Sequence, residues 1–158
     1  MISKTENATH KKLFKNTGWI TALTAGCLLW AGPVLAGGDC PQPRKTKSAP
    51  AHLVKTAIPA SADTRAGKKL FHKTAKPMAC KICHGKTGAG NGKLGKALKP
   101  EPRNFTCSKS MKKVSPGQMF WIIKNGSKGT GMVAHKKTLK DKDIWNLVKY
   151  INTEFAKR

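Results

Sequence analysis

Acidic residues are scarce in this chain. Only seven of its 158 residues are Asp or Glu, whereas 31 are Lys or Arg. None of the seven lies near residues 80–84, which carry the most specific motif of the sequence. Acid–base and nucleophilic catalysis commonly use carboxylates paired with each other or with a His. The sequence therefore offers no paired-carboxylate or Ser/His/Asp site.

Strand patterns and internal repeats are also absent. No segment alternates apolar and polar residues as a half-buried strand does, and no fixed period recurs along the chain. Residues 90–96 match the letters of the glycine loops that bind dinucleotides and, nearly, phosphates. Neither match follows a strand in a βαβ unit, so both are accidental. The glycines more plausibly let the backbone turn tightly around a bound group.

Long apolar runs are limited to the N-terminus. Four lysines precede an apolar run over 19–35 that Thr and Pro interrupt, and small residues at 34–36 suit a peptidase. We expect residues 1–36 to be a signal peptide cleaved after Ala36. The run is short for a membrane span, which needs about 20 apolar residues. An uncleaved anchor and a lipoprotein site at Cys27 are weaker alternatives.

Export leaves a strongly basic mature chain. Residues 1–36 hold four of the basic residues and one of the acidic ones, so 27 basic and six acidic residues remain, a net charge of +21. Such a charge suits an acidic protein partner or an anionic membrane surface, although solubility alone is the simpler explanation. Nucleic acid is excluded as a partner by export, and the expected location is the periplasm.

The mature chain divides into a linker and one helical domain. Residues 37–62 are basic and Pro-containing, without periodicity, so we expect an extended, poorly packed linker. Residues 63–158 alternate helical signals with Gly-rich loops. Helices are predicted over 64–74 after an Asp63 cap, over 116–124 after a Ser115 cap, and over 141–155. The last has an apolar stripe formed by Ile144, Leu147, Val148 and Ile151. The fold class is therefore all-α, with a thin core that a large buried cofactor would help to close.

The most specific motif is Cys80-Lys81-Ile82-Cys83-His84. Two thiols three residues apart can add to the two vinyl groups of one haem, and the adjacent imidazole then binds the iron as the proximal ligand. A thioredoxin-type pair would follow a strand, and a zinc site would need a second ligand pair at similar spacing. Neither feature is present, so we expect one covalently attached haem c.

This arrangement resembles the class I cytochrome c family. The likeness extends from about Gly67 to Ile151 and includes a helix leading into the Cys-x-x-Cys-His motif, a middle helix, a Met-bearing loop and a C-terminal helix. In that family the terminal helices cross through a Gly/aromatic contact. The resemblance assigns Gly67 and Phe71 to one side of that contact and Leu147 and Tyr150 to the other. It also implies that a Pro carbonyl orients His84, from either Pro100 or Pro102.

The resemblance places the sixth iron ligand at Met132, between the middle and last helices. Met and His together close the iron to outside ligands, which suits electron transfer. His135, three residues later, is the rival ligand, and an open sixth position is the third alternative. Met119 is expected in the core and Met111 in a polar loop, whereas Met78 lies too close to the motif. His52 and His72 are expected at the surface.

Two further cysteines remain in the mature chain, Cys40 and Cys107. An even pair in an oxidising compartment predicts a disulfide that ties the N-terminal segment down. Two free thiols are the alternative, and Cys107 as a haem ligand would contradict the assignment of Met132.

The function implied is that of a periplasmic monohaem c-type cytochrome, a non-enzymatic carrier of single electrons between redox proteins. The alternative is a haem-bearing redox subunit, or the catalytic haem, of a larger periplasmic oxidoreductase complex; a lysine-rich surface-binding module is a third hypothesis. We expect a monomer or a subunit with acidic redox partners. In a class I fold the lysines of the two loops around the haem would form a cationic docking face, namely Lys81, Lys86, Lys93, Lys96, Lys99, Lys124, Lys128, Lys136 and Lys137.

Overall fold

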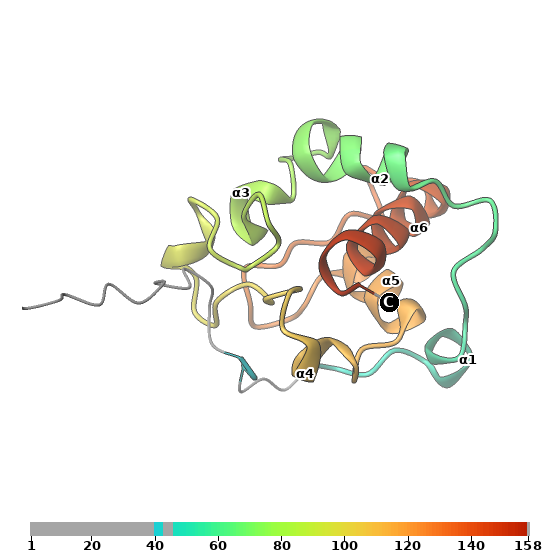
Figure 1. The fold of residues 1–158 in the computed structure, drawn as a ribbon, viewed down its shortest axis with the longest axis horizontal. Coiled ribbons are helices and arrows are strands. Elements are labelled where there is room, and N and C mark those ends of the chain that lie inside the picture. Colours follow the sequence, from blue (N-terminus) through green and yellow to red (C-terminus); the bar gives the residue numbers. More distant parts are fainter. Residues whose placement is uncertain (1–39, 43–45, 158) are drawn as a thin grey trace, which may run out of the picture. The chain divides into compact units, whose positions relative to one another are not determined.

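A computed structural model of the chain describes residues 40–42 and 46–157, and the expected signal peptide lies outside these ranges. The described residues form helices joined by loops and contain no strand, which confirms the all-α fold (Figure 1). Among these residues, no helix combines the length and hydropathy of a membrane span. In chain order the elements are α1 (Ala51–Val54), α2 (Thr64–Lys69), η1 (Leu70–Thr74), α3 (Lys81–His84), η2 (Gly95–Ala97), α4 (Ser108–Met111), α5 (Pro116–Asn125), α6 (Asp141–Tyr150) and η3 (Ile151–Phe155).

The predicted first helix is present as α2 and its wider continuation η1. The Asp63 carboxylate caps it by accepting a hydrogen bond from the Ala66 N–H at 2.7 Å. This bond is the main reason that the pKa of Asp63 is lowered, because it favours the charged carboxylate. The Asp63 N–H in turn donates to the Asn146 side chain of α6 at 2.7 Å, so α6 helps to fix the start of α2.

Helices α2 and α6 cross at Gly67 and lie side by side (Figure 1). A Cβ at Gly67 would overlap the backbone carbonyl of Asn146 and come within 2.8 Å of the Tyr150 Cβ. The Phe71 and Tyr150 rings meet one turn later, with their centroids 5.6 Å apart. The predicted crossing is therefore confirmed for Gly67, Phe71 and Tyr150, although Asn146 rather than Leu147 meets the glycine.

The core lies between α2, α5 and α6. The four predicted stripe residues of the last helix are each at most 3% exposed, because one face of α6 and η3 turns inward along its whole length. The cluster that they share also contains Tyr150 of α6 and side chains from other helices and loops, namely Phe71, Phe105, Met111, Met119, Phe120, Ile123 and Leu139. Met111 is 1% exposed on α4, so its expected place in a polar loop was wrong.

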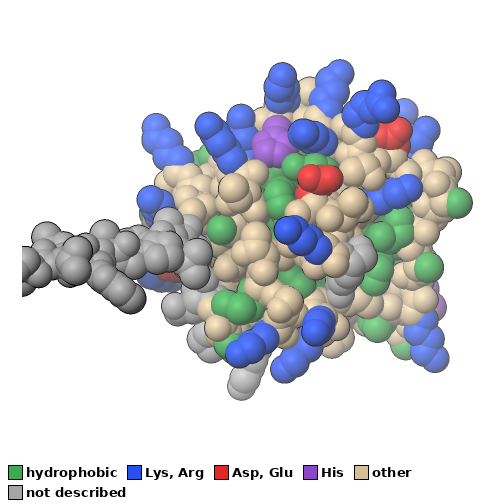
Figure 2. All heavy atoms as spheres, viewed as in Figure 1, with side chains coloured by type: hydrophobic (Ala, Val, Ile, Leu, Met, Phe, Trp, Pro, Cys, Tyr) green, Lys and Arg blue, Asp and Glu red, His purple; other side chains and the backbone are tan. Residues whose placement is uncertain are grey.

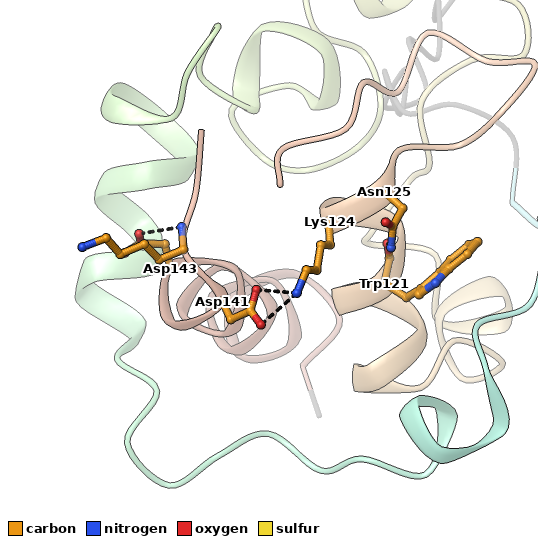
Figure 3. Close-up of polar contacts among 6 residues, drawn as sticks. Trp121, Lys124, Asn125, Asp141 and Asp143 are labelled. Atoms are coloured by element: carbon orange, nitrogen blue, oxygen red, sulfur yellow. Dashed lines mark hydrogen bonds and ion pairs between the residues drawn. The ribbon is translucent and has the colours of Figure 1, made fainter. Parts of the chain in front are cut away.

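Helix α5 begins and ends where the sequence predicts. The Ser115 hydroxyl accepts from the Gln118 N–H at 3.1 Å, and the helix stops at Gly126, whose φ is +74°. An ion pair joins its C-terminal turn to the start of α6, with Lys124 Nζ 2.7 Å from an Asp141 carboxylate oxygen (Figure 3). Lys124, one of the lysines expected in the docking face, is therefore paired with Asp141.

Residues 46–62 contact the helical domain at several points, although most of their side chains are exposed. The Gln118 side chain accepts from the Ala49 N–H at 2.7 Å and donates to the Lys47 carbonyl at 3.0 Å. Helix α1 packs against α5, where Gly117 allows the Leu53 carbonyl to approach closely. The sequence did not predict this packing, because the segment contains Pro and Lys residues and has no apolar periodicity.

Candidate functional site

The Cys-x-x-Cys-His motif folds into a single helical turn, α3. The His84 N–H donates to the Cys80 carbonyl at 2.9 Å, which places both thiols and the imidazole along one turn of backbone. Gly85 ends the turn with a φ of +80°, a conformation that favours glycine. Among the described residues, Cys80 and Cys83 are the cysteines outside a disulfide.

Burial affects both thiols of the motif, and Cys80 more than Cys83. Cys80 packs against the hydrophobic core, and burial raises the pKa of its thiol to about 12. Burial also raises the pKa of the Cys83 thiol. A thioredoxin-type nucleophile needs a lowered thiol pKa. The structure therefore argues against a thiol–disulfide exchange site here.

The His84 ring is held by residues 103–105. Its Nδ1 lies 3.3 Å from the Arg103 carbonyl oxygen. Because a carbonyl can only accept, the ring proton belongs on Nδ1, and Nε2 then carries the lone pair that an iron ligand needs. The Phe105 ring stacks on the imidazole, with centroids 4.5 Å apart and planes inclined by 15°. One carbonyl and one aromatic face thus set the orientation of the ring.

The orienting carbonyl is not the one that the family resemblance implied. The Arg103 carbonyl lies at Nδ1 of the imidazole, whereas the Pro102 carbonyl accepts from the Gln42 side chain at 3.0 Å. The role falls to Arg103, one residue later. A backbone acceptor has no residue-type signature, so the sequence could not identify it. Phe105 could have been noticed as an aromatic residue just beyond the glycine-rich loop.

The glycine-rich loop folds over the last carbonyls of α3. The Gly92 N–H donates to the Cys83 carbonyl at 3.0 Å, and the Gly90 N–H donates to the His84 carbonyl at 2.8 Å. A Cβ at Gly92 would lie 2.7 Å from the Cys83 carbonyl oxygen. The glycines therefore permit close backbone approach to the motif itself, where the sequence suggested a turn around a haem edge.

Met132 lies in a loop that contacts chain segments on both sides of the motif. Its side chain is half-buried against the same hydrophobic cluster as Cys80. The neighbouring Gly131 packs against the Leu98 side chain, from the loop that follows the motif. This placement agrees with the distal-ligand prediction, which stays a prediction.

His135 ties the same loop to the segment that precedes the motif. It is 5% exposed, and its Nδ1 lies 2.9 Å from the Lys76 carbonyl oxygen. The Thr138 hydroxyl donates to that same carbonyl at 2.9 Å. These contacts anchor the loop through His135. Because His84 is held by the same kind of contact, they do not decide between Met132 and His135 as the sixth ligand.

A disulfide links Cys40 to Cys107 in the structure, with Cα atoms 5.5 Å apart. Cys107 is 3% exposed, and the bridge engages its sulfur. The segment expected to be tied down is therefore attached beside residues 103–105.

His72, expected at the surface, is half-buried and lies 2.8 Å from the Tyr150 hydroxyl. Burial is the main cause that lowers the pKa of His72.

Lysine side chains are spread over the protein surface, with few acidic side chains among them (Figure 2). Of the expected docking lysines, those in the loop after the motif and in the Met132 loop are exposed, namely Lys86, Lys93, Lys96, Lys99, Lys128, Lys136 and Lys137. Lys99 pairs with Glu101 at 3.4 Å. Two exposed apolar side chains, Leu94 and Val133, lie on these same two loops at 45% and 49% exposure.

The residues present fit a haem c. Two unbridged thiols and an imidazole with its proton on Nδ1 lie on one turn, and a thioether from a separate loop is half-buried against the same apolar cluster. Among the described residues, no group of His, Cys, Asp and Glu is placed to hold a separate metal ion. A pocket of about 710 Å³ is lined by residues of 86–87, 106–112 and 154–157, and none of the predicted haem ligands lines it.

The comparison with protein families agrees with this site. The family model described as cytochrome c oxidase, cbb3-type, subunit III, matches residues 62–151, more than half of the chain. No curated protein matches. A solved structure of the reducing HAO-like protein complex of Kuenenia stuttgartiensis is similar, with 24% identity and a TM-score of 0.49, over 73% of this chain and 48% of that one. This chain thus spans about half the length of its structural neighbour.

The family match covers the Cys-x-x-Cys-His turn, the Met132 loop and the α2–α6 crossing together. These features describe a class I-like c-type cytochrome, and hence a haem-bearing electron-transfer protein. By the match over residues 62–151, the chain belongs to the cbb3-type cytochrome c oxidase subunit III family of cytochrome c domains.

Proposed function

We propose that this protein is a periplasmic monohaem carrier of single electrons. The observation that carries the proposal is the α3 turn, where two unbridged thiols precede an imidazole whose Nδ1 faces the Arg103 carbonyl. Cys80 and Cys83 would hold one haem covalently, with His84 as the proximal and Met132 as the distal ligand of the iron. The haem would supply a one-electron couple between ferric and ferrous iron.

The chain's own residues would hold both iron ligands in place. The Arg103 carbonyl and the Phe105 ring orient His84, and the Lys76 carbonyl anchors the Met132 loop through His135. A six-coordinate iron leaves no place for a substrate, so the protein would act as a carrier. Export and a mature N-terminus near Gly37 are part of the proposal.

Mass spectrometry of the periplasmic fraction tests the attachment. The mature protein should start near Gly37 and carry the mass of one haem. A Cys80→Ala, Cys83→Ala double variant should accumulate without the added mass. A wild-type mass equal to that of the bare polypeptide would contradict the proposal.

The exposed lysines of the two haem-flanking loops would form a docking face for an acidic redox partner. Such a field can raise association rates by about 10- to 1,000-fold at low salt. Exposed charges are screened over about 8 Å at physiological ionic strength, so the rate should fall steeply as salt is added. Loose electrostatic docking also lets the partner leave after transfer.

Charge reversal on the two sides of the molecule tests this face. Lys96→Glu, in η2 beside the motif, should slow electron transfer with an acidic partner at low salt. Lys55→Glu is the matched control, since Lys55 is equally exposed but follows α1. Equal slowing by both variants, or a rate independent of salt, would show that the positive charge serves solubility or surface attachment instead.

The second candidate function is that of a haem-bearing subunit in a larger redox complex. The family model favours it, because its description names a subunit of an oxidase. Purification under mild conditions distinguishes the two functions. A subunit should copurify with a larger enzyme, whereas a carrier should elute as a monomer.

A further inference from the structure

The N-terminal segment contacts the loop that orients His84. Gln42 forms two hydrogen bonds there, one on each side of Arg103. Its amide nitrogen donates to the Pro102 carbonyl at 3.0 Å, and its amide oxygen accepts from the Asn104 N–H at 2.9 Å. The side chain therefore spans the residue whose carbonyl faces the imidazole.

Two more contacts attach the same segment to the same loop. The Arg103 guanidinium donates to the Thr46 hydroxyl at 3.1 Å. The disulfide between Cys40 and Cys107 attaches the segment again, four residues beyond Arg103. Three residues of the N-terminal segment, Cys40, Gln42 and Thr46, thus bind residues 102–107, which include Arg103.

The orientation of a histidine ligand depends on the partner of its second ring nitrogen. A hydrogen bond from Nδ1 fixes the ring and raises the electron-donating strength of the imidazole. Any side chain that fixes the carbonyl acceptor therefore acts on the iron through the histidine. Here that acceptor is a loop carbonyl. No regular secondary structure fixes its position, so its position depends on the contacts that the loop makes.

We propose that Gln42 is a positioning residue for the proximal imidazole, holding the Arg103 carbonyl in place and thereby tuning the redox potential of the haem. The inference rests on the proposed role of His84 as the proximal ligand. It assigns to the N-terminal segment a function beyond attachment, because the segment becomes part of the surroundings of the iron. Gln42 bonds to the residues on both sides of Arg103 and acts on the imidazole through the Arg103 carbonyl.

The test compares two glutamines that each form a pair of hydrogen bonds with backbone groups of a distant segment. Gln42→Ala removes both bonds across Arg103. Gln118→Ala removes two bonds of the same kind, to Ala49 and Lys47, but leaves residues 102–104 untouched. Both holoproteins should lose thermal stability. Only Gln42→Ala should shift the midpoint potential to more positive values, because a weaker Nδ1–H bond makes the imidazole a poorer donor to ferric iron.

Two further readouts separate positioning from general loosening. In the reduced, diamagnetic holoprotein, the NMR signal of the His84 Nδ1–H proton should move in Gln42→Ala and stay in place in Gln118→Ala. The Asn104 amide should exchange its proton about fivefold faster in Gln42→Ala, the factor that corresponds to the loss of one hydrogen bond. Gln42→Met keeps the length of the side chain and adds no charge but loses both hydrogen bonds, so it should shift the potential in the same direction. It serves if Gln42→Ala does not fold.

The potential and the proton signal decide the inference. If both stay at wild-type values in the Gln42 variants, or move equally in Gln118→Ala, the inference is overturned. Failure of the proposed function has a different signature, because the wild-type protein would then carry no covalent haem and show no His84 signal of a ligated imidazole.

Discussion

Replacing Gly67 by alanine should weaken the protein, although alanine is the better helix former. Alanine at a helical site is favoured over glycine by about 1 kcal/mol. At this site, however, the new methyl group would overlap the Asn146 backbone carbonyl and lie 2.8 Å from the Tyr150 Cβ. A backbone carbonyl cannot rotate away, so α2 and α6 must separate.

The size of the loss follows from these two opposing effects. Overpacking in a filled core costs about 1–3 kcal/mol, and the upper end applies here because a backbone atom is in the way. Subtracting the gain in helix propensity leaves a net loss of about 2 kcal/mol in the free energy of unfolding. For a domain of this size, that corresponds to a melting temperature lower by about 8 °C.

Thermal unfolding of the holoprotein, followed by far-ultraviolet circular dichroism, provides the measurement. Lys68→Gly is the matched control, since it places a glycine at the next position of α2, where the side chain is exposed. It should cost about 1 kcal/mol, the difference in propensity alone. If Gly67→Ala instead melts at or above the wild-type temperature, the close crossing of α2 and α6 is not as described.

Three further predictions follow from the site and its surroundings. Met132→Ala should remove the absorption band of the Met–iron bond from the red end of the oxidised spectrum, whereas His135→Ala should keep it; the reverse result would exchange their roles. Non-reducing peptide mapping should find Cys40 joined to Cys107, and Cys40→Ser should cost about 4 kcal/mol of stability, as expected for a loop closed across 67 residues; alkylation of both thiols in the native protein would contradict the bridge. Burial lowers the pKa of His72, so the unfolded chain takes up its proton first and the stability due to this group is lost as pH falls below about 6.5. His72→Gln should flatten that part of the stability profile, and an unchanged profile would show that other groups cause it.

The sequence alone determined the features that depend on local order. The cap at Asp63, the cap at Ser115 and the apolar stripe of the last helix depend on residues a few positions apart, and the structure has all of them. The Cys-x-x-Cys-His motif is equally local, because its chemistry needs two thiols and an imidazole on one turn. The all-α fold followed from these elements and from the lack of strand patterns.

Only the tertiary structure decided how distant segments meet around His84. Arg103 contributes a backbone carbonyl, which any residue could supply, and Gln42 bonds to both neighbours of Arg103 across about 60 residues of sequence. The same limit hid the burial of Met111 and the docking of residues 46–62, since neither segment has a periodic apolar pattern. Side chains that act through local spacing can be read along the chain. Backbone groups that act through long-range contacts become visible only when the chain is folded, because their chemistry is the same at every residue.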